Sequence, residues 1–218
     1  MKKLIVLILF CITPYCFSET TILHHQIGDQ SFFSKEIEIK KDKQFNITKL
    51  TPIATENMNC LSDYSTTTWT LKNNETSANI LVERKNNSLI INGKIRNETF
   101  LNKKEQIDNS PWYQSMNRAA QQFLNANKNS QSFWFFSSYS LKLHKMEFTD
   151  KELVQININN KLQNAYKIRV TFPGWKSRFW SSYFWFDESK KEFIRYEGRQ
   201  GPPGAKLTVI TKTNKKPS

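Results

Sequence analysis

The side chains in this sequence that could do chemistry are three histidines, one internal cysteine and a few adjacent carboxylates. Metal sites generally use His or Cys at helical or hairpin spacing with carboxylates nearby. His144 stands apart, and His24 and His25 are adjacent and would point to opposite sides of a strand. A cysteine–histidine nucleophile would need Cys60 beside one of these rings, and its flanking residues match no thiol-enzyme motif. We therefore predict no metal site, and we interpret Cys60 as a small buried side chain.

Hydrolases and nucleotide-binding proteins have recognisable motifs, and none of them occurs here. The sequence has no Gly-x-Ser-x-Gly elbow, no Ser-x-x-Lys pair and no glycine-rich phosphate loop. Paired carboxylates would suit a glycosidase, and the candidates are Asp187 with Glu188 and Asp150 with Glu152. Both pairs lie where a hairpin turn is expected, so we interpret them as solvated turn residues. We predict no catalytic residue, no cofactor and no enzymatic activity; the enzyme alternative requires two carboxylates to converge in a cleft.

The unusual feature of the sequence is a concentration of aromatic residues in its second half. Five of six tryptophans lie between 112 and 185, and seven aromatic side chains lie within 175–186, so aromatics occur on both faces of any strand there. One interpretation is a central strand buried on both sides; the other is an apolar pocket. The predicted ligand-binding residues have three roles. The lid face would consist of Trp112, Met116 and Phe123, and the walls of Trp134, Trp180, Phe184 and Trp185. Lys176 and Arg178 at the rim would bind an anionic headgroup.

Short runs in which apolar and polar residues alternate dominate the chain and predict strands. In the first half they include 37–39, 45–47 and 69–71, and in the second half 141–148, 154–158, 166–172 and 207–209. Altogether the pattern predicts about ten strands. Asn92–Gly93 lies between two such runs and predicts a two-residue hairpin turn, because both residues accept a positive φ.

One segment between the halves has the helical period instead. Ser110 suits an N-cap and Pro111 a first turn, and apolar residues recur at helical spacing from Trp112 to Leu124 before an asparagine-rich stop. A single helix covers only part of a twisted antiparallel sheet. We therefore predict a mainly β (α+β) fold, with a curved antiparallel sheet or half-barrel of about ten strands around one mid-chain amphipathic helix.

The first 18 residues have the features of a bacterial export signal. A charged start at Met1–Lys3 precedes an apolar run over 4–12 that is too short to span a bilayer, and Cys16 and Ser18 provide small side chains for cleavage. We predict cleavage near Ser18, one β-rich domain over 19–210 and a basic flexible tail over 211–218. The mature chain would then be soluble in the periplasm or secreted.

The charge and composition restrict the partners. The chain has 32 Lys and Arg against 19 Asp and Glu, a formal charge of +13 that falls to +11 when Lys2 and Lys3 leave with the signal. Such an excess favours anionic surfaces such as lipopolysaccharide or phospholipid headgroups, and export argues against nucleic acid. A composition with 38% hydrophobic and 23% charged residues excludes collagen-like, disulfide-framework and long disordered chains.

Local motifs in the second half carry a family resemblance. They are Ile107–Gln114, Phe133–Trp134, Ala165–Val170, Phe179–Trp180, Tyr183–Asp187, Arg195–Gly198 and Gly201–Gly204. With these motifs the chain, over roughly residues 105–210, resembles a group of uncharacterised exported bacterial proteins whose fold is like that of the periplasmic lipoprotein carriers. The resemblance implies a curved antiparallel sheet lidded by helical structure, whose hollow holds an acyl chain in such carriers; it identifies no individual ligand-contacting residue.

Two functions from different classes follow from these patterns. The first is an exported non-enzymatic binding protein that holds a lipid or other amphipathic ligand in an aromatic-lined half-barrel cavity. The alternative is a protein–protein interaction module, docking on an envelope protein or host surface, with a filled core and no small ligand. A cavity of several hundred Å³ inside the sheet favours the first, and closely packed aromatics favour the second.

Overall fold

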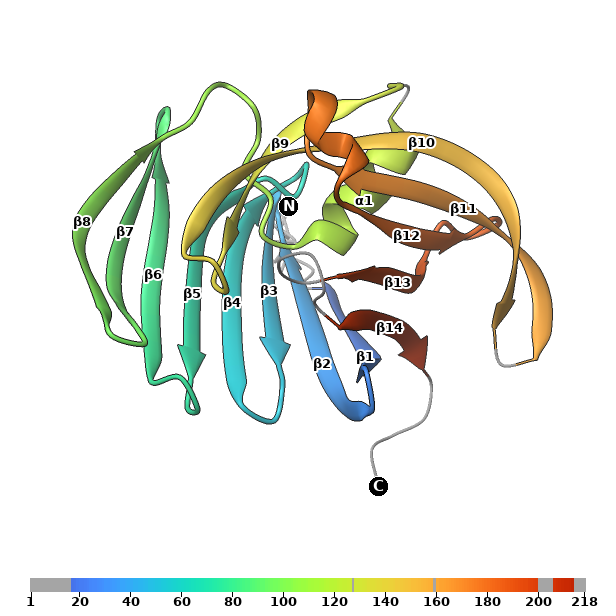
Figure 1. Ribbon diagram of the computed structural model, residues 1–218, viewed down its shortest axis with the longest axis horizontal. Coiled ribbons are helices and arrows are strands. Elements are labelled where there is room, and N and C mark those ends of the chain that lie inside the picture. Colours follow the sequence, from blue (N-terminus) through green and yellow to red (C-terminus); the bar gives the residue numbers. More distant parts are fainter. Residues whose placement is uncertain (1–16, 127, 159, 200–205, 214–218) are drawn as a thin grey trace, which may run out of the picture.

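The computed structural model describes residues 17–126, 128–158, 160–199 and 206–213. Over these residues the chain forms one curved antiparallel sheet of 14 strands with one α-helix packed inside its curve (Figure 1). The strands are β1 (Phe17–Ile27), β2 (Gln30–Lys41), β3 (Gln44–Leu50), β4 (Ala54–Leu61), β5 (Thr66–Asn73), β6 (Ala78–Lys85), β7 (Ser88–Ile95), β8 (Glu98–Gln106), β9 (Gln131–Ser137), β10 (Lys142–Ile158), β11 (Lys161–Thr171), β12 (Ser181–Asp187), β13 (Phe193–Arg199) and β14 (Leu207–Thr213).

The mainly β class, the antiparallel pairing and the single helix are as predicted, but the count of about ten strands was too low. Strands with few apolar residues were missed, as in β8, where Phe100 is the one buried side chain. Thr211–Thr213, which we placed in the tail, belong to β14. The predicted leader up to residue 16, the motif at 201–204 and the tail from 214 onward lie outside the described residues.

The sheet is open, and its two edge strands are neighbours in the sequence. The strand order runs from β8 through β1 to β14 and on to β9, so every pair except β1 with β14 joins consecutive strands. Residues 111–114, which we call the strap, connect the two halves. The backbone N–H of Thr66 in β5 donates to the carbonyl of Trp112 at 2.7 Å, and that of Tyr113 donates to Trp134 of β9 at 2.9 Å. The strap therefore holds β9 against the first half of the sheet.

The helix α1 (Met116–Asn125) begins later than predicted. Ser110 and Pro111 were expected to start it, but Pro111 accepts a hydrogen bond from Trp134 as part of the strap, and extended backbone is needed there. Ser115 occupies the N-cap position without a capping side-chain bond. The helix buries Ala119, Ala120, Phe123 and Leu124 against β10, β11 and β12, which confirms its amphipathic pattern.

The predicted hairpin turn at Asn92–Gly93 is wrong, because β7 runs through both residues. The turns that flank β7 instead include Asn86 and Arg96, both with a φ of 55°. Gly93 lies at a register shift with β8 and has a φ of +115°. A glycine inside a strand commonly marks such a bulge, and this is the conformation that the Asn-Gly pair provides here.

Replacing Gly93 with alanine should lower the free energy of unfolding by about 1–3 kcal/mol. A Cβ at this position would overlap the carbonyl oxygen of Asn79 and lie 2.9 Å from the Cα of Ile80, in addition to the cost of the positive φ. Urea denaturation measures the change. Gly174→Ala is the matched control, because Gly174 also has a positive φ but open space around its Cβ. An equal loss in both variants would contradict the close approach.

Buried apolar side chains form three separate clusters. The first core lies between β3–β8, the strap and Phe136 of β9. The second core packs α1 against β9–β13. The outer cluster lies on the opposite face of β11–β13 and consists of Ala165, Trp185 and Ile194, with Val154, Ile156, Ile158 and Tyr183 packed against them.

The outer cluster exists because β10 is long and bent. Its pairing with β11 shifts register between Thr149 and Glu152, and Asp150 has a φ of 52°. Such a bulge bends the strand and increases its twist. Residues 152–158 and 161–164, which we call the arm, lie beyond the pairing of β11 with β12 and curve away from the rest of the sheet, at the right of Figure 1. The arm covers one face of β12 while α1 covers the other, so the interpretation of an aromatic strand buried on both sides is confirmed.

Candidate functional site

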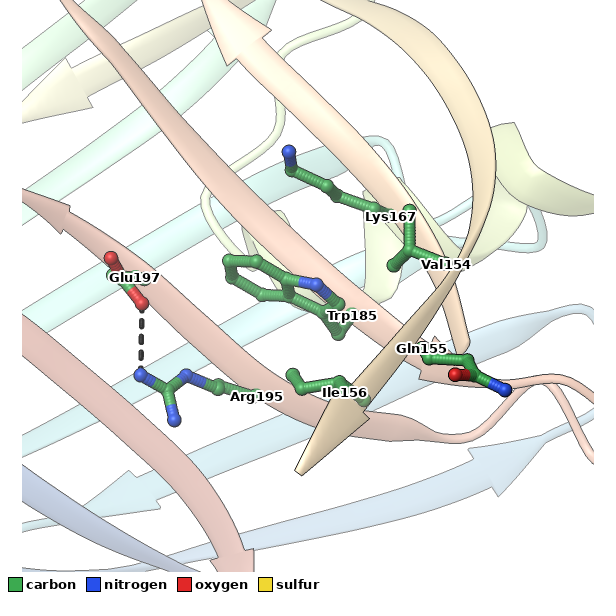
Figure 2. A pocket seen from close by; sticks show the side chains of 7 residues that line it. All are labelled: Val154, Gln155, Ile156, Lys167, Trp185, Arg195 and Glu197. Carbon is green, nitrogen blue, oxygen red and sulfur yellow. Dashed lines mark hydrogen bonds and ion pairs between the residues drawn. The ribbon is translucent and has the colours of Figure 1, made fainter. Parts of the chain in front are cut away.

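A groove between the arm and the outer face of the sheet is the first candidate site. Its volume is about 360 Å³. Figure 2 shows the indole of Trp185 between Lys167 on one side and Arg195 on the other, with the end of β10 crossing beside it. The side chains that line the groove are Val154, Gln155, Ile156, Lys167, Trp185, Arg195 and Glu197.

The polar groups of the groove are held in place. Arg195 donates from Nη2 to Oε2 of Glu197 at 2.8 Å, and its guanidinium lies 5.9 Å from the Trp185 ring. The Nε of Arg195 is buried and has no hydrogen-bond acceptor among the described residues. A buried donor without an acceptor is costly.

A smaller, more polar cavity of about 230 Å³ adjoins the groove and shares Lys167 with it. The Lys167 ammonium lies 4.4 Å from the ring centroid of Tyr183, which also lines this cavity. Arg169 forms an ion pair with Asp150 at 3.6 Å. The two cavities together therefore combine an apolar wall on the arm with cations from β11 and β13.

The carboxylates singled out from the sequence have different surroundings. Asp150 and Glu152 were predicted in a solvated turn, which is wrong: they lie in β10 at the bulge and line the smaller cavity. No motif marks a bulge of this kind in advance. Glu188 does lie in a turn, whereas Asp187 ends β12 just before it, and Oδ1 of Asp187 accepts hydrogen bonds from Ser189 and from the Lys190 N–H at 2.7 Å. Hydrogen bonds from Ser189 and Lys190 hold the pKa of Asp187 below its usual range.

The nine predicted ligand-binding residues do not come together in one cavity. Trp112 is fully buried in the first core, and half-buried Trp134 packs against it. Trp185 is the one member of the nine that lines the groove. Side chains from α1 and the strap fill the space inside the curved sheet, so the predicted residues are divided among separate clusters. The four of the nine that belong to the second core are Met116, Phe123, Trp180 and Phe184.

The two predicted rim cations do not take part in that core. Lys176 and Arg178 lie on the short 3₁₀ helix η1 (Gly174–Arg178) between β11 and β12, where both are exposed. They line neither of the two cavities described above.

Inside the curve, a buried polar cluster lies where β2 faces α1. Glu36 is 1% exposed and Glu38 is 8% exposed. The Arg118 Nε donates to Oε1 of Glu36 at 3.0 Å and lies 2.9 Å from Oε2 of Glu38. The Lys49 ammonium lies 3.5 Å from Glu36, and the Tyr64 hydroxyl donates to Glu38 at 2.9 Å. This cluster fixes the helix to β2 through charge, in addition to the apolar contacts that α1 makes with β10–β12.

The two glutamates of this cluster have opposite pKa shifts. Burial raises the pKa of Glu36, but Lys49 and Arg118, with hydrogen bonds from Asn117 and Arg118, outweigh it and hold the pKa below its ordinary value. Burial raises the pKa of Glu38 above its ordinary value, because the attraction of Arg118 and the hydrogen bond from Tyr64 do not compensate. The surroundings of the two carboxyl groups therefore shift their pKa values in opposite directions.

The sequence predicted the opposite orientation for β2. The alternation of Ile37 and Ile39 with glutamates favoured buried isoleucines, but Glu36 and Glu38 face inward and Ile39 is 37% exposed. The pairing partner Arg118 is distant in the sequence, so no local signal reveals it. A phase error of one residue turns every side chain of a strand to the other face.

The histidines and the cysteine have the arrangement that the sequence predicts. His25 stacks on Phe32, with ring centroids 4.6 Å apart, whereas His24 contacts Phe33 on the other side of the strand. Cys60 is buried, and burial raises its pKa to about 11. Within the described part of the chain, no three His, Cys, Asp or Glu side chains form a group that could hold a metal ion.

No helix within the described ranges is long and apolar enough to cross a membrane. The scan of protein-family models finds no match, and the search of curated proteins also finds none. The fold is similar to that of a β-barrel-like protein of a domain of unknown function, DUF1849, from Brucella abortus. That likeness has a TM-score of 0.52 and 4% identity, and covers 90% of this chain and 98% of that chain.

Two further solved structures have lower scores. The hypothetical lipoprotein YmcC from Escherichia coli has a TM-score of 0.40 and 12% identity, with 93% of this chain and 89% of that chain covered. The LolA superfamily protein NE2245 from Nitrosomonas europaea has a TM-score of 0.30 and 7% identity, with 91% and 84% covered. At 4% identity the likeness to the DUF1849 protein shows a shared fold alone, and a curved, β-barrel-like architecture of this kind is the one expected from the sequence.

Proposed function

We propose that this chain is an exported, non-enzymatic binding protein for a lipid or other amphipathic ligand. Its binding site is the groove between the arm and Trp185, not the interior of the curve. The observation that carries the proposal is a groove of about 360 Å³ that combines an indole floor and an aliphatic wall with the cationic side chains of Lys167 and Arg195. This volume lies within the range of small-molecule sites, about 300–1,000 Å³.

The chemistry of the groove favours a ligand with an apolar body and an anionic head. Val154 and Ile156 face Trp185 and would contact the apolar part. Lys167 and Arg195 flank the indole and would bind a carboxylate or phosphate. The leader-like residues 1–18 support a location in the periplasm or outside the cell, and the intact mass of the purified protein would show cleavage near Ser18.

The filled interior supports a second candidate, the interaction module. Large side chains that are buried almost completely occupy the inner face of the sheet, where the cavity was expected, including Trp69, Trp112, Phe123, Phe133 and Phe148. Such a protein would dock on an envelope protein or anionic surface and carry no small ligand. The two candidates differ in whether a lipid co-purifies.

Native mass spectrometry should show a stoichiometric mass increment on the protein purified from a bacterial periplasm without detergent, and organic extraction should identify it as lipid. With a single-chain anionic lipid such as lysophosphatidylglycerol, Lys167→Glu should weaken binding about 10- to 100-fold, because a charge-assisted hydrogen bond contributes about 1.5–3 kcal/mol. Titration calorimetry measures the affinity.

Lys161→Glu is the matched control, since it makes the same charge change on the same strand outside the groove. It should leave the affinity within about twofold of the original protein. A bare mass together with no lysolipid binding would reject the groove and favour the interaction module. Equal losses in both variants would show that net charge, and not the groove, controls binding.

A further inference from the structure

The loop between β11 and β12 presents two large aromatic rings to solvent. Trp175 and Phe179 are each 70% exposed. Their rings pack edge to face, with centroids 5.5 Å apart and an interplanar angle of 88°, so they form one apolar projection. Exposed apolar groups of this size generally mark an interaction site.

The base of this loop is firmly attached to the sheet. Thr171 is buried, and its hydroxyl donates to the carbonyl of Trp180 at 2.8 Å. Arg169 donates to the carbonyl of Ser177 at 2.8 Å, and the Trp180 indole N–H donates to the carbonyl of Arg199 at 2.8 Å. The ring of Trp180 also contacts Phe172. The fold therefore holds the two aromatic rings outward.

The charges of the loop are all of one sign. Lys176 and Arg178 lie between the two exposed rings in the sequence and are themselves exposed. The sequence from 172 to 186 contains no Asp or Glu. Asp150, which approaches the base of the loop through Arg169, is paired with that arginine at 3.6 Å. A surface with exposed aromatics and cations complements an anionic lipid headgroup region.

From this geometry we propose that the loop docks the protein on an anionic phospholipid bilayer. Trp175 and Phe179 enter the interface between headgroups and acyl chains, where aromatic side chains are favoured, while Lys176 and Arg178 bind phosphates. The protein remains peripheral. Docking requires the loop alone and does not depend on a ligand in the groove, although Arg169 connects the two by lining the smaller cavity and bonding Ser177.

Vesicle co-sedimentation tests this proposal. We expect the protein to bind phosphatidylcholine vesicles that contain about one third phosphatidylglycerol, and to bind pure phosphatidylcholine much less. The double variant Trp175→Ala/Phe179→Ala should bind the anionic vesicles roughly tenfold or more weakly. The affinity of Lys176→Glu/Arg178→Glu for anionic vesicles should fall at least about fivefold for each basic residue that is replaced. Added salt should weaken the binding of the original protein.

Controls separate the loop from other causes. Leu101→Ala removes a strongly exposed apolar side chain from β8 and should leave vesicle binding unchanged. Because all four substituted loop residues are exposed, thermal unfolding should be unchanged in the variants. The original protein and all variants are expressed and purified by the same procedure, so any retained leader contributes equally to the binding of each.

A spectroscopic measurement locates the insertion. Brominated lipids quench tryptophans that enter the bilayer, so part of the emission should be quenched in the original protein and not in Trp175→Phe. Full vesicle binding by Trp175→Ala/Phe179→Ala, or no binding of the original protein to anionic vesicles, would overturn the proposal. Equal binding to neutral and anionic vesicles would overturn the assigned role of the two cations.

Discussion

Arg118→Met should lower the free energy of unfolding by about 3–5 kcal/mol, the loss typical when one partner of a buried ion pair is removed. Glu36 and Glu38 would keep their burial but lose the guanidinium that lies within 3.0 Å of both. The long methionine side chain keeps most of the volume, so the change isolates charge from packing. Urea denaturation at neutral pH measures the loss.

The origin of this loss can be separated by further substitutions. Adding Glu36→Gln and Glu38→Gln to Arg118→Met should recover part of the stability, because amides are cheaper to bury than unpaired carboxylates. Arg84→Met is the control, since the half-buried Arg84 donates to the carbonyl of Asn86, forms no ion pair among the described residues, and should change stability by less than about 0.5 kcal/mol. If Arg118→Met were as mild as Arg84→Met, the cluster would not fix the helix.

Stability should also fall as the pH decreases from about 6.5 to about 4. Burial, with contributions from Lys49 and His24, lowers the pKa of His25 to about 4 in the folded protein. In the unfolded chain the ring has its ordinary pKa of about 6.5, so the unfolded state binds more protons within this window. The stability that neutral His25 contributes is complete above pH 6.5 and is lost toward pH 4, on the order of 3 kcal/mol in total.

Substitution of single histidines tests this assignment. His25→Gln keeps a hydrogen-bonding group near Ser34, 2.7 Å from the ring nitrogen, and should flatten stability between pH 6.5 and 5. His144 has its pKa lowered by burial and Lys142, so a smaller slope of the same sign should remain. His24→Gln should keep most of the slope, because burial, the largest cause of the lowered His25 pKa, remains. A steep slope in His25→Gln would contradict the assignment.

The two glutamates of the buried cluster act on opposite sides of pH 4.5, Glu36 below it and Glu38 above it, within the window of His25. The stabilising contribution of Glu36, whose pKa is lowered, is present above its ordinary value of 4.5 and disappears as the pH falls through its folded value. Glu38 has a raised pKa and opposite sign, since protonation favours its folded form. The difference between the original protein and His25→Gln therefore isolates the histidine.

The fold class could be predicted from local patterns, since period two indicates strands and the spacing of Ala119, Phe123 and Leu124 indicates the buried face of a helix. The Asn-Gly pair was misleading because its tolerance of positive φ serves a bulge in β7 as well as a turn. The number of residues between two successive turns depends on how the strand pairs with its neighbours. Local sequence does not contain that information.

The candidate sites depended even more on distant residues. The density of aromatics around Trp185 was visible in the sequence, but its division between two faces results from the bulge in β10, which brings the arm over β12. Lys176 and Arg178 were selected as cations near aromatics, and their neighbours Trp175 and Phe179 are the exposed rings. The sequence drew attention to this segment but could not distinguish a cavity rim from a surface projection.

The pairing of β1 with β14 has a consequence for the order of folding. Every other pair in the sheet joins consecutive strands, which local hairpins can form quickly, so β1–β8 and β9–β14 can each assemble from nearby residues. Pairing Leu23 with Lys212 instead closes a loop that contains nearly the whole chain, at a large entropic cost. A chain that is synthesised from its N-terminus onward therefore has to wait for β14 before the two halves can join through β1, and the β1 edge is unpaired until then.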